Sequence, residues 1–295
     1  MLAYMIYEKE EGEKNKRFIE LFQREGVRFG ISFLFLPKES YQEKELPDLV
    51  LNRTRDREVS LWYENRNVPV LHGSALVEIG NDKWKTYCHL REYFRKKKIS
   101  FSLPDTVCFP EFTVEGLSQK IAKADWHRGE NLVLKTVDGH GGREVFLFTA
   151  EELMRGSFTD DRKKVFQLLT GRKCVLQEQV DSQAMDVRVY VVGNEIYHGV
   201  LRQGKVDFRS NFSLGGSVRE YFFSEEEEAV IRNCREAFSD LTLGMLGLDF
   251  IVARDGKLVF NEMEEMVGSR MLYSCSKKDI VKDYVAWIGW SFLAV

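Results

Sequence analysis

Proline and cysteine are scarce in this sequence, and long uncharged apolar runs are absent. Only 5 Pro and 5 Cys occur among 295 residues. The cysteines are scattered with no CxxC pair, which argues against a disulfide framework and favours a reducing compartment where thiols pack as small hydrophobes. No stretch reaches the roughly 18 uncharged apolar residues of a membrane-spanning helix. The apolar N-terminus also lacks the preceding basic residues of a signal peptide, so we expect a cytoplasmic protein without a membrane partner.

A marked excess of charge of one sign is also missing. Lys and Arg total 43 and Asp and Glu total 46, so the net charge is −3. A chain this balanced is not built around a large basic face, and we expect no nucleic-acid partner. The hydrophobic share of 44% and the aromatic share of 13% exclude intrinsic disorder, because burial of that apolar surface offsets the chain entropy. At this length we expect two or three packed units.

Short apolar runs alternate with charged, helix-like stretches over the first 80 residues. This β-α-β order predicts a small parallel α/β domain. The predicted strands cover residues 2–7, 31–36, 49–52 and 68–71. Helices are predicted at 14–25, 57–65 and 82–98. Further strands are predicted at 106–109, 131–135, 144–148 and 173–178, and the acidic run after Ser224 predicts a helix start. The apolar tail predicts a buried terminal helix. The division that we expect is an N-terminal domain at 1–80, a unit with a glycine-rich hairpin at 81–180 and a C-terminal unit at 181–295.

A glycine-rich tip joins two predicted strands, and the entering strand carries Lys135. Glycines let the backbone approach a phosphate closely, and the exposed N–H groups are anion donors. A lysine nearby can hold phosphate oxygens as a mobile point charge. A plain flexible hairpin explains the glycines as well, so both interpretations stay open here. The tip consists of Gly139, His140, Gly141 and Gly142.

Two further segments have the composition of nucleotide contacts. An apolar strand runs into a polar connector, where backbone groups would suit an adenine edge, although a strand end at the surface explains it equally. Later, Arg202 and Arg209 lie near Asn211, and two arginines can clamp phosphate or carboxylate oxygens bidentately. A charged hairpin loop is the alternative there. The connector consists of Gln177, Glu178, Gln179 and Val180.

Three carboxylates fall on one predicted hairpin. Asp249 lies in the predicted apolar strand 248–252, and Glu262 and Glu264 follow the next predicted strand, 258–260. They are two residues apart, so on an extended segment both carboxylates face the same side. A carboxylate inside an apolar strand is costly unless it is paired or bound to a metal. Oxygen ligands without Cys or His suit Mg²⁺ rather than zinc. The pattern predicts a magnesium site.

The order of these elements resembles the RimK-type ATP-grasp ligases. The resemblance extends from about residue 81 to 267, and it is closest at Asp186-Val187-Arg188 and at the Asp-Phe-Arg-Ser-Asn run that ends at Asn211. It implies an α/β (α+β) ATP-grasp fold, in which an N-terminal parallel α/β domain precedes two sheet-based subdomains that clamp ATP. Two positions depart from the family pattern. Glu264 stands where an Asn is usual, and Met266-Val267-Gly268 replaces a common Pro-Gly.

The resemblance also implies a role for each candidate residue. Lys83 and Lys135 would bind the ATP phosphates, and the tip 139–142 would cover them. The connector would hold the adenine, Asp186 the ribose hydroxyls, and Arg209 and Asn211 the reacting phosphate region, with Arg202 and Arg209 as the catalytic arginines. The metal ligands would be Asp249, Glu262 and Glu264, holding Mg²⁺ or Mn²⁺.

The implied activity is ATP-dependent ligation of a carboxylate to an amine through an acylphosphate. The expected partners are a carboxylate substrate and an amine acceptor, either a small molecule or a peptide or protein tail, and a homo-oligomer is compatible with this. Three alternatives remain at this point. They are an ATP-grasp enzyme that crosslinks side chains of a precursor peptide, a small-molecule kinase, and a nucleotide-binding regulator without turnover.

Overall fold

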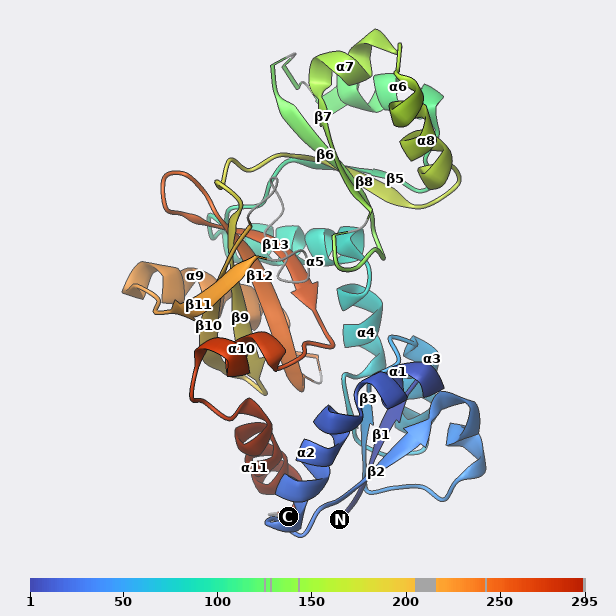
Figure 1. Ribbon diagram of the computed structural model, residues 1–295, viewed down its shortest axis with the longest axis vertical. Coiled ribbons are helices and arrows are strands. Elements are labelled where there is room, and N and C mark those ends of the chain that lie inside the picture. Colours follow the sequence, from blue (N-terminus) through green and yellow to red (C-terminus); the bar gives the residue numbers. More distant parts are fainter. Residues whose placement is uncertain (125, 128, 143, 205–215, 242, 294–295) are drawn as a thin grey trace.

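The computed structural model describes residues 1–124, 126–127, 129–142, 144–204, 216–241 and 243–293. Within these residues the strands form three separate sheets, one of five strands and two of four. Figure 1 shows them as three units, with the N-terminal unit and the glycine-hairpin unit at opposite ends of the molecule. The C-terminal unit lies between them. Each sheet falls inside one of the ranges expected above, while the exact domain boundaries stay a prediction.

The first sheet has the order β2-β1-β3-β4, and its neighbouring strands are parallel. This confirms the parallel α/β unit that the alternating apolar runs predicted. One helix was expected at 14–25, but two short helices meet at Asn15. The elements are β1 (Leu2–Tyr7), α1 (Lys9–Lys14), α2 (Lys16–Val27), β2 (Ser32–Pro37), the 3₁₀ helix η1 (Lys38–Glu43), β3 (Leu49–Asn52), α3 (Arg57–Glu64) and β4 (Val70–Leu71).

Two helices connect the first sheet to the second. Helix α4 (Ser74–Gly80) was not predicted, whereas α5 (Lys83–Lys97) was. The carboxylate of Asp82 caps α5 by accepting hydrogen bonds from the backbone N–H of Trp84 at 2.9 Å and of Lys85 at 3.0 Å. The cap determines where the helix begins, and it therefore places Lys83 in the first turn.

The second sheet is antiparallel, with the order β5-β8-β6-β7, and three helices pack on it. The β6–β7 hairpin carries the glycine-rich tip beyond its last paired residues. The predicted strands here are confirmed, and α8 was missed. The elements are β5 (Thr106–Phe109), α6 (Val114–Ala124), β6 (Asn131–Thr136), β7 (Val145–Thr149), α7 (Ala150–Arg155), α8 (Asp160–Leu169) and β8 (Cys174–Glu178).

The third sheet is antiparallel, with the order β11-β10-β9-β12-β13. The acidic run after Ser224 forms the expected helix start, with a full capping box between Ser224 and Glu227. The elements are β9 (Met185–Val192), β10 (Glu195–Gln203), β11 (Ser217–Tyr221), α9 (Glu225–Glu236), β12 (Met245–Val252), β13 (Leu258–Glu264), α10 (Arg270–Cys275) and α11 (Ile280–Phe292).

The C-terminal helix α11 packs against α2 of the N-terminal domain (Figure 1). Tyr284 meets Phe22 edge to face, with ring centroids 5.8 Å apart. Residues of the first and third sheets share one buried cluster with this helix. The apolar tail therefore completes the core of the N-terminal domain. None of the helices in the described ranges has the length and apolar character needed to cross a bilayer.

Candidate active site

An open pocket of about 840 Å³ lies where the second sheet, the third sheet and the start of α5 meet. The tertiary structure therefore brings most of the predicted site together from segments far apart in the sequence. The predicted residues that line it are Lys83, Lys135, Gly139, Gly141, Gly142, Gln177, Glu178, Gln179, Val180, Asp186, Arg202 and Glu262.

Lys83 ties the glycine hairpin to the third sheet. Its Nζ donates to the carbonyl oxygen of Gly139 at 2.5 Å and lies 3.4 Å from Glu262 Oε2. A Cβ at Gly139 would lie 2.4 Å from Thr136 Oγ1, so only glycine allows this close approach. Gly141 and Gly142 have φ values of +69° and +72°, which a side chain would strain. The hairpin tip is therefore built for close approach of backbone to ligand.

Lys135 is almost fully buried in the pocket wall and donates to Asn261 Oδ1 at 3.3 Å. Burial lowers the pKa of its ammonium to about 8, although the carboxylate of Glu262 opposes the shift. A buried ammonium with one long hydrogen bond is well suited to an anionic ligand, because an anion would supply the missing counter-charge.

We expect Lys135→Met to weaken ADP binding by roughly 10- to 100-fold. This is the loss of affinity that corresponds to one hydrogen bond to a charged group, about 1.5–3 kcal/mol. Wild-type affinity should also fall as the pH rises through about 8, since the free protein then loses the lysine proton that a phosphate needs. Calorimetry from pH 7 to 9.5 measures both effects, with Lys257→Met at an exposed turn as the control. Unchanged ADP affinity in folded Lys135→Met would contradict the assignment.

The polar connector forms one wall of the pocket. Gln177 donates its side-chain amide to the hydroxyl of Thr106 at 2.9 Å. The backbone N–H groups of Glu178 and Gln179 donate to Asp105 and Asn131, each at 2.9 Å. These bonds hold the connector between two parts of the second sheet. A base that binds there meets a preorganised edge rather than a flexible strand end.

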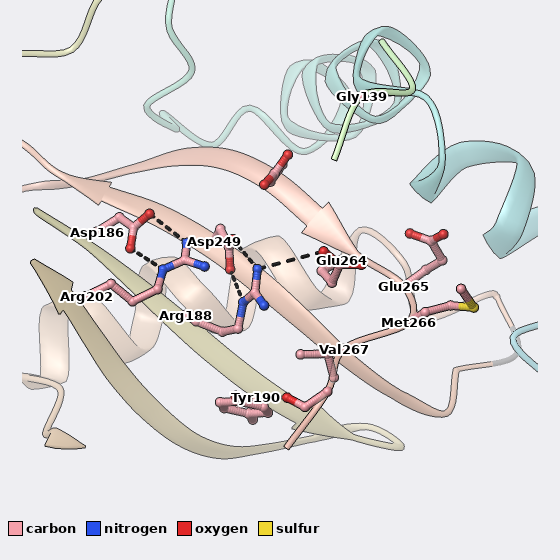
Figure 2. A network of polar contacts seen from close by, with 12 residues as sticks. Gly139, Asp186, Arg188, Tyr190, Arg202, Asp249, Glu264, Glu265, Met266 and Val267 are labelled. Carbon is pink, nitrogen blue, oxygen red and sulfur yellow. Dashed lines mark hydrogen bonds and ion pairs between the residues drawn. The ribbon is translucent and has the colours of Figure 1, made fainter. Parts of the chain in front are cut away.

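A row of alternating charges crosses the third sheet beneath the pocket (Figure 2). Arg202 donates to both carboxylate oxygens of Asp186, at 2.5 and 2.6 Å, and to Asp249 Oδ2 at 2.7 Å. Arg188 donates hydrogen bonds to both carboxylate oxygens of Asp249 at 2.7 and 2.6 Å. Asp249 is fully buried, and burial raises the pKa of its carboxyl, but the two arginines outweigh this and hold it at about 2. Asp249 is therefore ionised between its two arginines.

The backbone register suits the predicted magnesium ligands. Asp249 lies directly opposite Glu262 on β12 and β13, and Glu264 lies opposite Gly247, so all three side chains share one sheet face. In the structure these carboxylates pair with basic side chains. Glu264 lies 3.1 Å from Arg55 Nη2 and 3.9 Å from Arg188. No group of three metal-ligating side chains gathers anywhere in the described ranges. The donor chemistry and register fit Mg²⁺, and the triad itself stays a prediction.

Sequence reasoning assigned no role to two arginines that contact these carboxylates, Arg188 and Arg55. Arg188 alternates with Asp186 on β9, a spacing that could have revealed it. Arg55 belongs to the N-terminal domain, and no local signal links it to the site. His140 is exposed at the hairpin tip and is not among the residues that line the pocket. Arg209 and Asn211 lie outside the described residues.

Comparison with known proteins assigns this chain to a family. A family model described as the RimK-like ATP-grasp domain matches residues 96–288, more than half of the chain. The chain belongs to the RimK-like ATP-grasp family. The predicted fold class and the predicted enzyme class, an ADP-forming carbon–nitrogen ligase, are thereby confirmed.

Individual proteins give the same result for the fold. The chain is 32% identical over 161 residues to a probable alpha-L-glutamate ligase of Klebsiella pneumoniae (strain 342), covering 54% of this chain and 51% of that one. It is similar in structure to the D-cycloserine synthetase DcsG, with a TM-score of 0.72, 14% identity, and coverage of 99% and 100% of the two chains. The ATP-grasp ligase PsnB, solved with a minimal precursor, matches with a TM-score of 0.66, 16% identity, and coverage of 99% and 98%.

Proposed function

We propose that this ATP-grasp ligase joins the carboxylate of an acid to an amine through an acylphosphate, with ATP and Mg²⁺ in the described pocket. The observation that carries the proposal is the convergence of Lys83, Lys135, the glycine tip and Glu262 on one pocket, where Lys83 Nζ lies 3.4 Å from Glu262 Oε2. The lysines and backbone donors suit phosphates, and the carboxylate would hold a magnesium ion beside them.

In the first step a carboxylate oxygen of the substrate attacks the γ-phosphorus, the bond from that phosphorus to the β-bridging oxygen breaks, and ADP leaves. In the second step the amine nitrogen attacks the acyl carbon, inorganic phosphate departs with the former carboxylate oxygen, and the amine loses a proton to solvent. No covalent bond to the protein forms. Catalysis then consists of positioning the reactants and compensating their charge.

Each side chain has a part in this scheme. Lys83 and Lys135 hold the phosphates, while Arg202 faces the reacting region from the sheet. Glu262 and Glu264, with Asp249 behind them, would hold magnesium, which supplies charge neutralisation on the phosphate oxygens when it is bound. On the resemblance alone, Arg209 and Asn211 would contact the transferring group and Asp186 the ribose.

The acceptor is the open part of the proposal. An amino acid or a peptide amine is consistent with the relative named a glutamate ligase and with the neighbour solved with a precursor. A crosslinking reaction within a precursor peptide uses the same two steps, with a side-chain carboxylate and a side-chain amine or hydroxyl. It is the second candidate, because PsnB and this chain match over nearly their whole lengths.

The test measures ADP release from MgATP with a panel of amino acids and short peptides as acids and amines. We expect ADP and phosphate in equal amounts with the amide, and a hydroxamate when hydroxylamine replaces the amine, because hydroxylamine intercepts the acylphosphate. ADP formation with a stable phosphorylated hydroxyl and no hydroxamate would establish a kinase instead. Absence of ADP with every acid would contradict turnover of these substrates.

A further inference from the structure

One loop of the N-terminal domain reaches the metal end of the site. The loop follows β3 and is rigid, because Asn52 Oδ1 accepts from the backbone N–H of Thr54 at 3.0 Å and from its hydroxyl at 2.7 Å, while Asn52 Nδ2 donates to the carbonyl of Asp56 at 2.9 Å. At its tip Arg55 has φ +59°, a left-handed conformation that is uncommon and strained for arginine. The surrounding bonds hold that strain in place.

A second arginine fastens this loop to the segment after β13. The Nη2 of Arg53 donates to the carbonyl oxygens of Met266 and Val267, both at 3.2 Å. Its guanidinium lies 5.4 Å from the ring centroid of Phe18, in cation–π range, and the residue is largely buried. The loop and the end of β13 therefore act as one rigid unit. In this unit the Arg55 side chain lies against the carboxylates of Glu264 and Glu265.

The contacts of Arg55 are incomplete. Its Nη2 is hydrogen-bonded to Glu264 at 3.1 Å, but its Nε lies 3.4 Å from Glu265 Oε1 without forming a hydrogen bond. Glu265 is 1% exposed, and neither carboxylate oxygen has a hydrogen-bond partner among the described residues. The side chain of Arg55 is 34% exposed. A guanidinium with a buried, unsatisfied donor and an open side can take another anion at little cost.

Its position relative to the phosphates gives the kind of anion. Glu262 Oε2 lies 3.4 Å from Lys83 Nζ, which donates to Gly139, and the proposed function assigns these residues to the phosphates. Glu264 lies two residues further along the same face of β13, about 7 Å away along the strand. Arg55, paired with Glu264 at 3.1 Å, therefore lies beyond the proposed phosphate site along β13, and the proposed reaction places its phosphoryl acceptor on that side. That acceptor is a carboxylate in the proposed reaction.

We propose that Arg55 is the carboxylate-binding residue for the acid substrate, and that Glu264 occupies it until magnesium takes Glu264 as a ligand. This inference rests on the proposed function. A planar guanidinium suits a carboxylate bidentately and keeps its charge at every working pH. Glu264 thus has two partners in turn: the arginine without metal, and the metal once the nucleotide is bound. The Asn that is usual in the family would not pair with Arg55 in this way.

The first experiment measures how much Mg²⁺ is needed for tight ADP binding, by calorimetry on the full-length protein. Arg55→Gln frees Glu264 from its resting partner, so the Mg²⁺ midpoint should fall at least about threefold. Arg57→Gln, a nearby arginine paired with Glu58 and Glu78 at the surface, should leave it unchanged. An unchanged midpoint in folded Arg55→Gln would overturn the exchange.

The second experiment measures binding of amino acids and short peptides in the presence of MgADP. Free carboxylates should bind the wild type, bind Arg55→Gln at least about tenfold more weakly, and bind Arg55→Lys with intermediate affinity, because an ammonium lacks the fork. The same compounds capped as amides should not bind. Equal affinity for wild type and Arg55→Gln, or no carboxylate binding to the wild type, would overturn the proposal.

The two proposals fail in different ways. If carboxylates bind through Arg55 but no hydroxamate or amide forms, the ligase activity is wrong and the binding assignment stands. If amides form and the acid KM of Arg55→Gln equals that of the wild type, the assignment is wrong and the activity stands. If Arg55→Gln does not fold, Arg55→Lys decides: its ATP KM should stay within about twofold while the acid KM rises, and a rise in the ATP KM alone would place Arg55 at the phosphates.

Discussion

Glu262→Gln should lower kcat by roughly 100-fold or more, since loss of one preorganised charge contact at a reacting centre costs about 10²–10³ in kcat. Glu262 lines the pocket 3.4 Å from Lys83 and lies opposite Asp249 in the sheet register. Glutamine keeps the shape but removes the charge that would hold magnesium and balance the lysine. The measurement is steady-state ADP release across a Mg²⁺ titration, together with calorimetric ADP binding.

The matched control for this variant is Glu228→Gln, which removes an exposed carboxylate on α9 paired with Arg232. It should be indistinguishable from the wild type. If Glu262→Gln keeps wild-type turnover and an unchanged Mg²⁺ requirement, the ligand register along β13 is wrong. Glu264 and Glu265 would then be the residues to test.

Asp249→Asn should destabilise the protein by about 3–5 kcal/mol, the cost of breaking a buried ion pair by removing one partner. Arg188 and Arg202 both depend on this carboxylate, and all three side chains are nearly or fully buried. Asparagine keeps the volume but cannot compensate two positive charges. Urea unfolding measures the loss. Asp255→Asn, at the exposed turn of the same β12–β13 hairpin, should change stability by less than about 0.5 kcal/mol.

The pH dependence of stability independently tests the ion pairs that Asp249 forms with Arg188 and Arg202. The pKa of Asp249 is lowered from 3.8 to about 2 in the folded protein. The folded state therefore favours the ionised carboxyl, and the resulting stability is fully present above about pH 4. It should be lost as the pH falls from about 4 towards 2, and Asp249→Asn should lack that part of the acid transition. An identical acid transition in the wild type and in Asp249→Asn would contradict the ionised state of Asp249 in the folded protein.

Local patterns predicted most of the elements that build the pocket. The strand 2–7, the strand 49–52 and the strand 106–109 occur as predicted, because apolar runs bounded by turn residues need only a sheet to become strands. Asp82 and Ser224 cap their helices, since capping depends on side chains within three residues. Lys135 was placed on its strand for the same reason. The helices α4 and α8 were missed, because 7 and 10 residues are too short to show a clear helical period.

Side-chain partners were beyond such reasoning. The sequence predicted that Asp249, Glu262 and Glu264 share one face, and the register confirms it. It did not predict that Arg188 and Arg202 hold Asp249 or that Arg55 holds Glu264, because each partner comes from another strand or another domain. The pairing of charges depends on distances between segments that are up to 209 residues apart, and periodicity carries no information about them.

The sequence by itself determined the family, most of the strand and helix order, and the residue types that can hold a nucleotide and a metal. These follow from local propensity, from capping and turn chemistry, and from the order of motifs along the chain. Only the tertiary structure decided which charges neutralise one another and that the N-terminal domain reaches the site through Arg53 and Arg55. It also decided that α11 packs on α2, where residues of the first and third sheets join one buried cluster. The physical reason is that burial and ion pairing are properties of the space between segments, and that space exists only after the chain has folded.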